Sequence, residues 1–262
     1  MDRRQIWRRV RRAWIALGIG VTLAFTGWSL FAYRASAEAR AAIAPDSVVD
    51  VAHDGHIWSF VPRRSSIDAP ALIFFPGALV DPIAYAPLLH AVATAGFPAY
   101  LVALPRRGAF GGADDPELEE RLHRLLALPS TPRRWIVAGH SRGAVVASRL
   151  AAAPRSGFAG LVLIGTSHPR DVDLSTLQVG VTKIVGTRDG LASRAEVEAN
   201  RAKLPPTTRW VWIEGGNHSQ FGWYGFQPGD RRATVAAATQ RAIMIDAVID
   251  GLRQAFVAAP AS

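Results

Sequence analysis

Six short apolar runs, each separated from the next by a longer stretch, constrain the fold of this chain more than any other feature of its sequence. The runs are Ala71–Phe75, Ala99–Ala103, Trp135–Ala138, Leu161–Ile164, Thr182–Val185 and Trp210–Ile213. Continuous apolar runs of this length are typical of strands that are buried on both faces of a sheet. The sequence therefore predicts a layered structure with a mainly parallel sheet at its centre.

The longer stretches between the runs are predicted to be helical, and two of them begin with proline, which suits the first turn of a helix. They are Pro82–Ala95, Pro116–Leu128, Gly143–Ala153, Ser193–Leu204 and Ala233–Phe256. Upstream, Val48–Val51 and Ile57–Val61 flank a His-Asp-Gly turn and predict an antiparallel pair. Strands that alternate with helices imply right-handed crossovers. We expect an α/β fold with an open sheet of about eight strands and helices on both faces.

The N-terminus carries a different pattern. Residues 13–33 form a run of 21 residues without a charge, with Trp14 near one end and Trp28 near the other. As a helix, this run is roughly 30 Å long, which matches the apolar thickness of a bilayer. Six arginines precede it, so the positive-inside rule predicts a transmembrane signal-anchor with a cytoplasmic N-terminus and an extracytoplasmic domain.

The alternative is a cleaved signal peptide and a secreted product, because Ala35-Ser36-Ala37 has the A-x-A cleavage pattern. The apolar core of a signal peptide usually has about 7–15 residues, and this run is longer, which favours an uncleaved anchor. The predicted division is a basic flank and anchor over residues 1–35, a connector over 36–47 and an α/β domain over 48–262.

Charge and composition exclude several classes of protein. The net charge is +9, but residues 1–34 hold seven arginines and one aspartate, a balance of +6, which leaves 9 − 6 = +3 for the rest. That value is ordinary for a soluble domain, so we expect no nucleic-acid partner. The chain has no cysteine, which excludes disulfides, zinc-thiolate sites and a cysteine nucleophile. It also lacks an HExxH motif, so we expect no metal and no cofactor.

A candidate nucleophile lies where the third long run ends. Gly139-His-Ser141-Arg-Gly143 has the pattern G-x-S-x-G and stands between a predicted strand and a predicted helix. A serine hydroxyl must be exposed at a sharp turn beside a base to act as a nucleophile, and flanking glycines let strand and helix approach closely around it. This context predicts a nucleophile elbow with Ser141 at its tip.

The candidate base is His218, on the glycine-rich loop that follows the last predicted strand. From there its side chain could reach over the carboxyl ends of the strands. By contrast, His90 and His123 lie in predicted helices, His53 and His56 lie in the opening hairpin, and His140 lies inside the elbow. The candidate acid is Asp189, which follows the strand Thr182–Val185. Three rivals remain open, namely Asp171, Asp173 and Glu214. The order Ser141, Asp189, His218 is the one expected for such a sheet.

An oxyanion hole needs two N–H donors. The amide of Arg142 begins the helix after the elbow, and the turn Pro76-Gly77-Ala78-Leu79 follows the first long run. Gly77 permits the turn, and the amide of Ala78 or of Leu79 is predicted to supply the second donor.

These motifs together resemble those of the α/β-hydrolase family over roughly residues 48–257. The G-H-S-R-G elbow and the loop G-G-N-H-S-Q-F-G at residues 215–222 look most similar to the dienelactone-hydrolase-like bacterial branch. The resemblance implies hydrolysis of ester-like bonds by a triad of Ser141, Asp189 and His218. One departure is Ala144 after Gly143, where a second glycine is frequent.

The sequence thus predicts a membrane-anchored, carboxylesterase-like serine hydrolase that acts on a small ester or acyl substrate. Acyl transfer to an acceptor other than water would use the same residues. A non-catalytic, membrane-tethered binding protein with the same fold is the alternative from another class. An aromatic loop, residues 221–226, lies just past His218 and is expected either to line an acyl pocket or to pack in the core.

Overall fold

The computed structural model describes residues 3–257 except 67, 128–131, 133 and 154–156. Its centre is one sheet of eight strands in the order β1-β2-β4-β3-β5-β6-β7-β8. The strands are β1 (Val49–Asp54), β2 (Ile57–Pro62), β3 (Ala71–Phe75), β4 (Ala99–Val102), β5 (Trp135–His140), β6 (Gly160–Ile164), β7 (Gly180–Gly186) and β8 (Arg209–Ile213). β1 and β2 pair antiparallel, β2 pairs antiparallel with β4, and the remaining neighbours are parallel.

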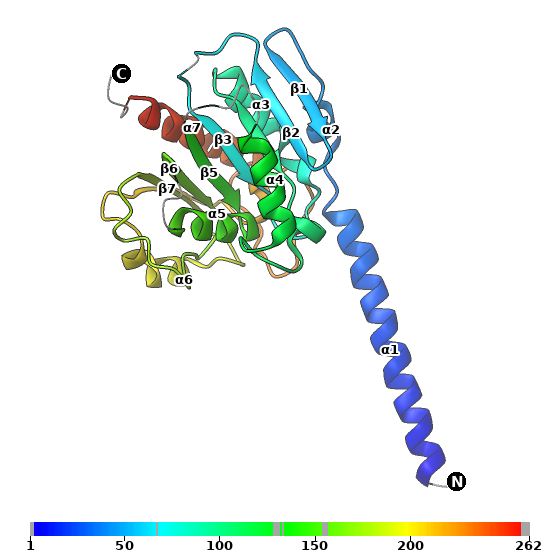
Figure 1. Cartoon of the computed structure of the whole chain (residues 1–262). Coiled ribbons are helices and arrows are strands. Elements are labelled where there is room, and N and C mark those ends of the chain that lie inside the picture. The colour runs from blue at the N-terminus through cyan, green and yellow to red at the C-terminus, as the bar shows by residue number, and fades with distance from the viewer. Residues whose placement is uncertain (1–2, 67, 128–131, 133, 154–156, 258–262) are drawn as a thin grey trace.

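Helices cover both faces of this sheet (Figure 1). They are α3 (Ala86–Thr94) and α7 (Ala237–Val257) on one face, and α4 (Pro116–Leu126), α5 (Arg142–Ala152) and α6 (Arg194–Ala199) on the other, with 3₁₀ turns η1 (Pro82–Tyr85), η2 (Pro105–Gly108), η3 (Arg201–Lys203) and η4 (Ser219–Phe221). Side chains alternate between the two layers: Leu72 and Phe74 of β3 face one core, and Ile73 and Phe75 face the other. The central strands are apolar throughout because both of their faces are buried. The predicted α/β fold, with a mainly parallel sheet of eight strands, is confirmed.

The N-terminal segment is one continuous helix, α1 (Arg3–Ala32), which projects away from the domain (Figure 1). No helix in the described part of the chain is both long enough and apolar enough to cross a membrane. The transmembrane role predicted for residues 13–33 is therefore not supported. The six arginines belong to the same helix as the apolar run and lower its mean hydropathy.

The predicted connector is structured and packs on the domain. It contains a short helix, α2 (Ala37–Ala41), whose first turn is capped by the side chain of Ser36. Ala35 and Ala39 are buried in the same core as α3 and α7. Two backbone bonds join this part of the chain to the loop after His218. Ser36 of the connector donates its N–H to Trp223 O (2.8 Å), and Gly225 donates its N–H to the carbonyl of Ala32, the last residue of α1 (2.7 Å).

Candidate functional site

The elbow forms where β5 meets α5. Ser141 lies between the two elements with φ 52° and ψ −114°, a conformation that few non-glycine residues adopt. The flanking glycines allow this turn. A Cβ atom on Gly143 would lie 2.0 Å from Phe75 O, and one on Gly139 would lie 2.2 Å from the carbonyl carbon of Gly143. The serine is thus held at a strained turn beyond the carboxyl end of a central strand, as the motif predicts.

A buried acid–base pair lies beside the elbow. His218 Nδ1 is 2.9 Å from Asp189 Oδ2, and each residue is about 1% exposed. Asp189 Oδ1 accepts the N–H groups of Leu191 (2.8 Å) and Ala192 (2.7 Å), which fixes the orientation of the carboxylate. His218 Nε2 is buried, and within the described residues it has no hydrogen-bond partner, Ser141 Oγ included. In sites without substrate, the bond between a serine and its base is often long or poorly aligned, so the lack of this bond does not exclude a nucleophile–base pair.

The three rival acids lie elsewhere. Asp171 pairs with Arg149 of α5 and with His168. Asp173 Oδ1 accepts the N–H of Ser175 within its own turn, and Glu214 Oε1 accepts the hydroxyl of Thr187. Of the four acids considered, Asp189 is the one that contacts His218.

His140 is part of a polar contact as well as of the packing around Ser141. Its ring centroid lies 4.5 Å from that of His218, and its Nδ1 lies 2.7 Å from the hydroxyl of Tyr85. The same hydroxyl accepts the N–H of Gly77 at 3.2 Å, so its own proton is available to His140. Burial, and then the proximity of His218, hold the pKa of His140 well below its ordinary value. His140 is therefore neutral near pH 7.

The turn after β3 carries the two amides considered for the second oxyanion donor, those of Ala78 and Leu79. Leu79 has φ 63°, and its N–H donates to Arg107 O at 2.7 Å, so this amide is occupied. The N–H groups of Ala78 and Arg142 make no hydrogen bond to a backbone carbonyl of any described residue. Ala78 rather than Leu79 is consequently the donor available to pair with Arg142.

The partner of Leu79, Arg107, belongs to a second strained segment, η2. Arg106 and Arg107 both have positive φ, 49° and 53°. Arg106 also pairs with Asp115, a mostly buried residue that caps α4. Sparsely populated backbone conformations such as these cost about 1–3 kcal/mol each and persist where surrounding contacts fix them.

Two residues that hold the histidine loop were missed by sequence reasoning. Asp230 accepts the N–H of His218 (3.3 Å) through Oδ1 and both the N–H (2.8 Å) and the hydroxyl (2.7 Å) of Ser219 through Oδ2. Gln240 of α7 accepts the N–H of Asn217 at 3.0 Å and donates to its carbonyl at 2.7 Å. In the sequence, Asp230 follows a glycine and is typical of a turn, and Gln240 is typical of the exposed face of a helix. Neither position indicates a contact with the histidine loop.

The aromatic loop after His218 serves mainly as packing. Phe221 and Trp223 are buried in the core. Tyr224 contacts both Tyr33, at the end of the N-terminal segment, and Tyr85, with ring centroids 6.1 and 6.3 Å apart respectively. These residues therefore have the expected packing role. None of the five cavities found in the described part of the chain is lined by Ser141.

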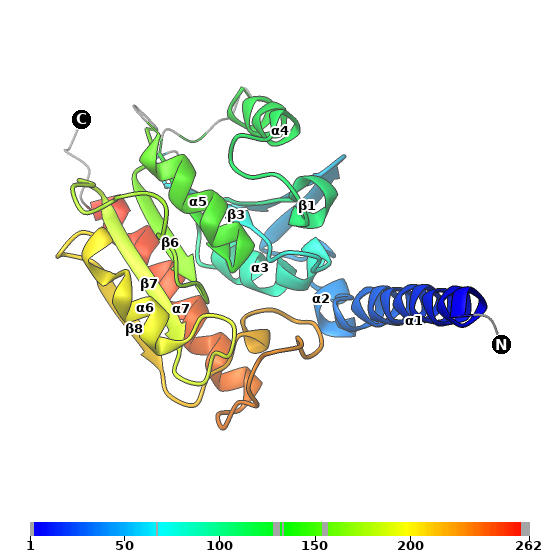
Figure 2. The same cartoon turned by 90° about the horizontal axis from the view of Figure 1, so that it is seen from below.

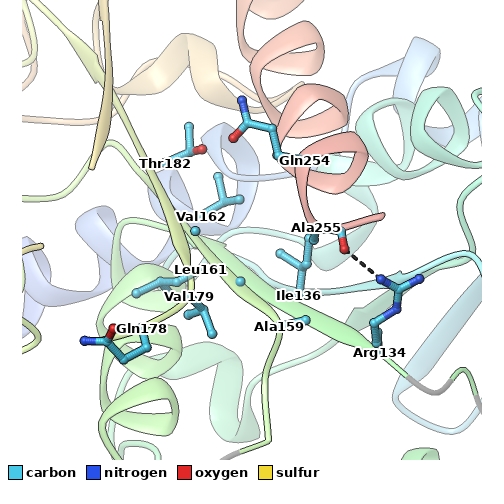
Figure 3. A pocket seen from close by; sticks show the side chains of 13 residues that line it. Arg134, Ile136, Ala159, Leu161, Val162, Gln178, Val179, Thr182, Gln254 and Ala255 are labelled. Carbon is cyan, nitrogen blue, oxygen red and sulfur yellow. Dashed lines mark hydrogen bonds between the residues drawn. The ribbon is translucent and has the colours of Figure 1, made fainter. Parts of the chain in front are cut away.

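A cavity of about 380 Å³ lies at the amino ends of the central strands, opposite the end that carries the elbow (Figure 3). Its lining includes Ile136 of β5, Gly160 of β6 and Gly180 of β7, which stand at the amino ends of their strands. Arg134 borders it and donates to Ala255 O at 2.8 Å. Because the elbow lies at the carboxyl ends, this cavity is separate from the candidate site. Within the described residues no group of three or more His, Asp and Glu side chains could hold a metal ion.

Comparisons with known proteins identify the family and the fold. The model of a family described as the alpha/beta hydrolase family matches residues 71–242. No curated protein is similar enough in sequence to count as a match. Among solved structures, a ferulic acid esterase from Streptomyces cinnamoneus is similar with a TM-score of 0.59 at 19% identity, over 76% of this chain and 71% of the esterase.

Two further structures are similar over nearly their whole length. A dienelactone hydrolase-like promiscuous phosphotriesterase from metagenomic libraries has a TM-score of 0.57 at 18% identity, over 79% of this chain and 99% of that one. A predicted CIB-like hydrolase from Thermoplasma acidophilum has a TM-score of 0.57 at 13% identity, over 77% and 99%. At these identities the likeness establishes the fold.

Proposed function

This chain belongs to the alpha/beta hydrolase family, and from that premise we propose that it is a serine hydrolase that cleaves carboxylic-ester-like bonds of small molecules. One observation carries the proposal: the buried contact of 2.9 Å between His218 Nδ1 and Asp189 Oδ2. It lies next to a serine held at positive φ between a strand and a helix. Several similar structures are esterases, which supports testing carboxylic esters first.

In the proposed mechanism, Ser141 Oγ attacks the carbonyl carbon of the ester while His218 Nε2 takes its proton. Asp189 keeps the other proton on Nδ1 and stabilises the imidazolium. The amides of Ala78 and Arg142 donate to the oxyanion. The proton on Nε2 then passes to the leaving alcohol. In the second half-reaction a water molecule, deprotonated by the same nitrogen, attacks the acyl-serine, and that proton passes to Ser141 Oγ as the acid leaves.

The neutral state of His140 supports this chemistry. Its ring lies 4.5 Å from that of His218, where a second positive charge would oppose formation of the imidazolium. Because burial keeps His140 uncharged, this ring adds no positive charge beside His218, whose Nδ1 contacts Asp189. Tyr85 fixes the ring of His140 through its hydroxyl and connects it to the turn that carries Ala78.

Labelling with a fluorophosphonate probe tests the proposal. The full chain is purified in a neutral detergent beside Ser141→Ala, His218→Ala and Ser65→Ala, the last being an exposed serine outside the site. We expect rapid labelling of the wild type and of Ser65→Ala, none of Ser141→Ala, and at least a hundredfold slower labelling of His218→Ala. If the folded wild type is not labelled, the chain is a non-catalytic member of the family.

Hydrolysis is separated from acyl transfer by the products. p-Nitrophenyl esters of increasing acyl length are supplied with and without an added alcohol. We expect the free acid to be the main product in both cases. An acyl-alcohol product that exceeds the free acid would instead identify a transferase that uses the same residues.

We further propose that α1 attaches this domain to a membrane. Twelve large apolar side chains of α1 are more than a third exposed, Trp14, Leu17 and Leu23 among them, and the first turns of the helix are rich in arginine. Apolar side chains and adjacent arginines together favour binding to anionic lipid. The proposal concerns attachment and does not require the helix to cross the bilayer.

Flotation with vesicles of anionic lipid tests the attachment. We expect the full chain to float with the vesicles and Leu17→Arg/Leu23→Arg to stay largely at the bottom of the gradient. Val48→Arg, which adds a charge at an exposed apolar residue of the domain, is the control and should float like the wild type. Equal flotation of all three proteins would contradict attachment through α1.

A further inference from the structure

An open cavity of about 620 Å³ lies beside the histidine loop, on the side of the domain where α1 ends. Its walls are the end of the histidine loop, residues 224–226 and the beginning of α7, whose first residue, Ala237, lines it. Gly225 lines the cavity and is bonded to Ala32, the last residue of α1. Figure 2 shows this loop, in orange, next to the base of α1. Ser141 and His218 do not line the cavity, so it is distinct from the candidate site.

The cavity carries excess positive charge. Two arginines line it, the exposed Arg232 and the half-buried Arg241. Arg241 donates to Gly222 O at 2.9 Å, but its Nε has no partner among the described residues. The closest carboxylate, Glu38 Oε2, is 3.9 Å away and two-thirds exposed. Arg232 makes no ion pair with any described side chain.

Arg241 is half-buried, which strengthens the attraction of its charge for an anion. Burial lowers the pKa of Arg241, and the exposed carboxylate of Glu38 opposes this only in part. The positive end of the dipole of α7, a helix of 21 residues, lies at the same cavity. An oxyanion between the two arginines would balance these charges through charge-assisted hydrogen bonds.

The lining also includes apolar groups. Phe226 is 46% exposed, and Tyr224, Ala233 and Ala237 line the cavity with it. An exposed aromatic ring beside two arginines suits a ligand that carries an anionic head and an apolar chain. A simple anion would leave the exposed ring of Phe226 uncovered.

We propose that this cavity binds the phosphate head group of an amphiphile, with Arg232 and Arg241 on the phosphate and Phe226 against the apolar chain. The position at the base of α1 points to a membrane lipid as the source of that head group. The identity of the source rests on the proposed membrane attachment, whereas binding itself does not, nor does it depend on the hydrolase activity.

Tryptophan fluorescence offers a direct test, because the guanidinium of Arg241 lies 4.6 Å from the ring centroid of Trp223. The full chain in a neutral detergent is titrated with octyl phosphate, with inorganic phosphate and with octyl glucoside. Arg232→Gln and Arg241→Gln are compared with Arg253→Gln, which removes an exposed arginine near the other end of α7. Trp223→Phe shows whether the signal arises at this site.

We expect saturable binding of octyl phosphate that weakens roughly tenfold or more in each cavity variant and is unchanged in Arg253→Gln, because each loses a charge-assisted hydrogen bond. Arg232 is exposed, so its variant folds even if Arg241→Gln does not. Inorganic phosphate binding as tightly, with the same arginine dependence, would identify free phosphate as the source. Equal affinity in all variants, or equal binding of octyl glucoside, would overturn the proposal. Fluorophosphonate labelling of Ser141 is read in parallel and should be the same in every variant.

Discussion

Replacing Asp189 by asparagine gives a sharp test of the proposed role of this acid, because the structure fixes how the new amide must lie. Asp189 Oδ1 accepts two backbone N–H groups, from Leu191 and Ala192. An NH₂ group cannot accept them, so the oxygen of the asparagine must take the Oδ1 position. The NH₂ group then faces His218 Nδ1, which has to accept a hydrogen bond instead of donating one.

The consequence is a change of tautomer. With Nδ1 as an acceptor, the single proton of neutral His218 moves to Nε2, the nitrogen that should take the proton of Ser141. The same substitution at the equivalent position of a serine protease lowers kcat by about 10⁴. We expect Asp189→Asn to lower kcat by about 10³–10⁴, which corresponds to roughly 4–5.5 kcal/mol of activation free energy. Since the side chains have the same shape and the two backbone bonds are kept, the fold should be retained.

The assay is hydrolysis of p-nitrophenyl acetate, with the thermal midpoint measured on the same samples. Asp171→Asn and Asp173→Asn are the matched controls, since these acids make local contacts away from His218, and both should stay within about twofold of the wild type. A loss smaller than tenfold in Asp189→Asn, or an equal loss in either control, would refute the reasoning.

Three further predictions concern the scaffold around the site. Gly143→Ala should lower the free energy of unfolding by about 3 kcal/mol or more in urea titrations, because its Cβ would lie 2.0 Å from Phe75 O; a change below 1 kcal/mol would contradict the close approach. Asp230→Ala should destabilise the domain by about 3 kcal/mol and lower kcat more than it raises KM, since it frees the backbone of His218; kinetics equal to the wild type would exclude this positioning role. Burial lowers the pKa of Lys183 from 10.5 to about 7. Between these pH values the unfolded chain binds a proton that the folded chain lacks, so the free energy of unfolding should rise from pH 7 to pH 10. Urea titrations at both pH values should show this rise in the wild type and not in Lys183→Met.

The sheet could be predicted from the sequence because its central strands are buried on both faces, which leaves an uninterrupted apolar run for each of them. Errors occurred where that signal ends. The predicted helix Ser193–Leu204 is divided into α6 and η3, and the helix predicted from Pro82 starts as a 3₁₀ turn. Such boundaries depend on local capping and on packing, which a hydrophobic pattern does not record.

The sequence could indicate those candidate site residues that come shortly after a strand. Ser141, Asp189 and His218 each come just after a strand, so the order of the strands along the chain indicates where they meet. Asp230 and Gln240 could not be found in this way, because their contacts with the histidine loop depend on how the segment before α7 folds back. The short α2 was missed for a similar reason: five residues are too few to form a helix alone, and this one is stabilised by its docking on the domain.

The join between α1 and the domain limits how freely the two parts of the protein could be separated. Tyr33 and Ala35 are 6% and 2% exposed, and Asp81 donates its N–H to Tyr33 O at 2.9 Å. A chain shortened to begin at Glu38, or cleaved near Ala37, would lose both side chains and uncover Tyr224. The loss is large because the burial of one aromatic ring removes about 150–250 Å² from water. Helix and domain are therefore not interchangeable modules. A chimera in which α1 is replaced has to keep the native residues from Tyr33 onward if the domain is to stay stable. The orientation of the domain relative to α1 is set by this packed contact and not by a flexible linker.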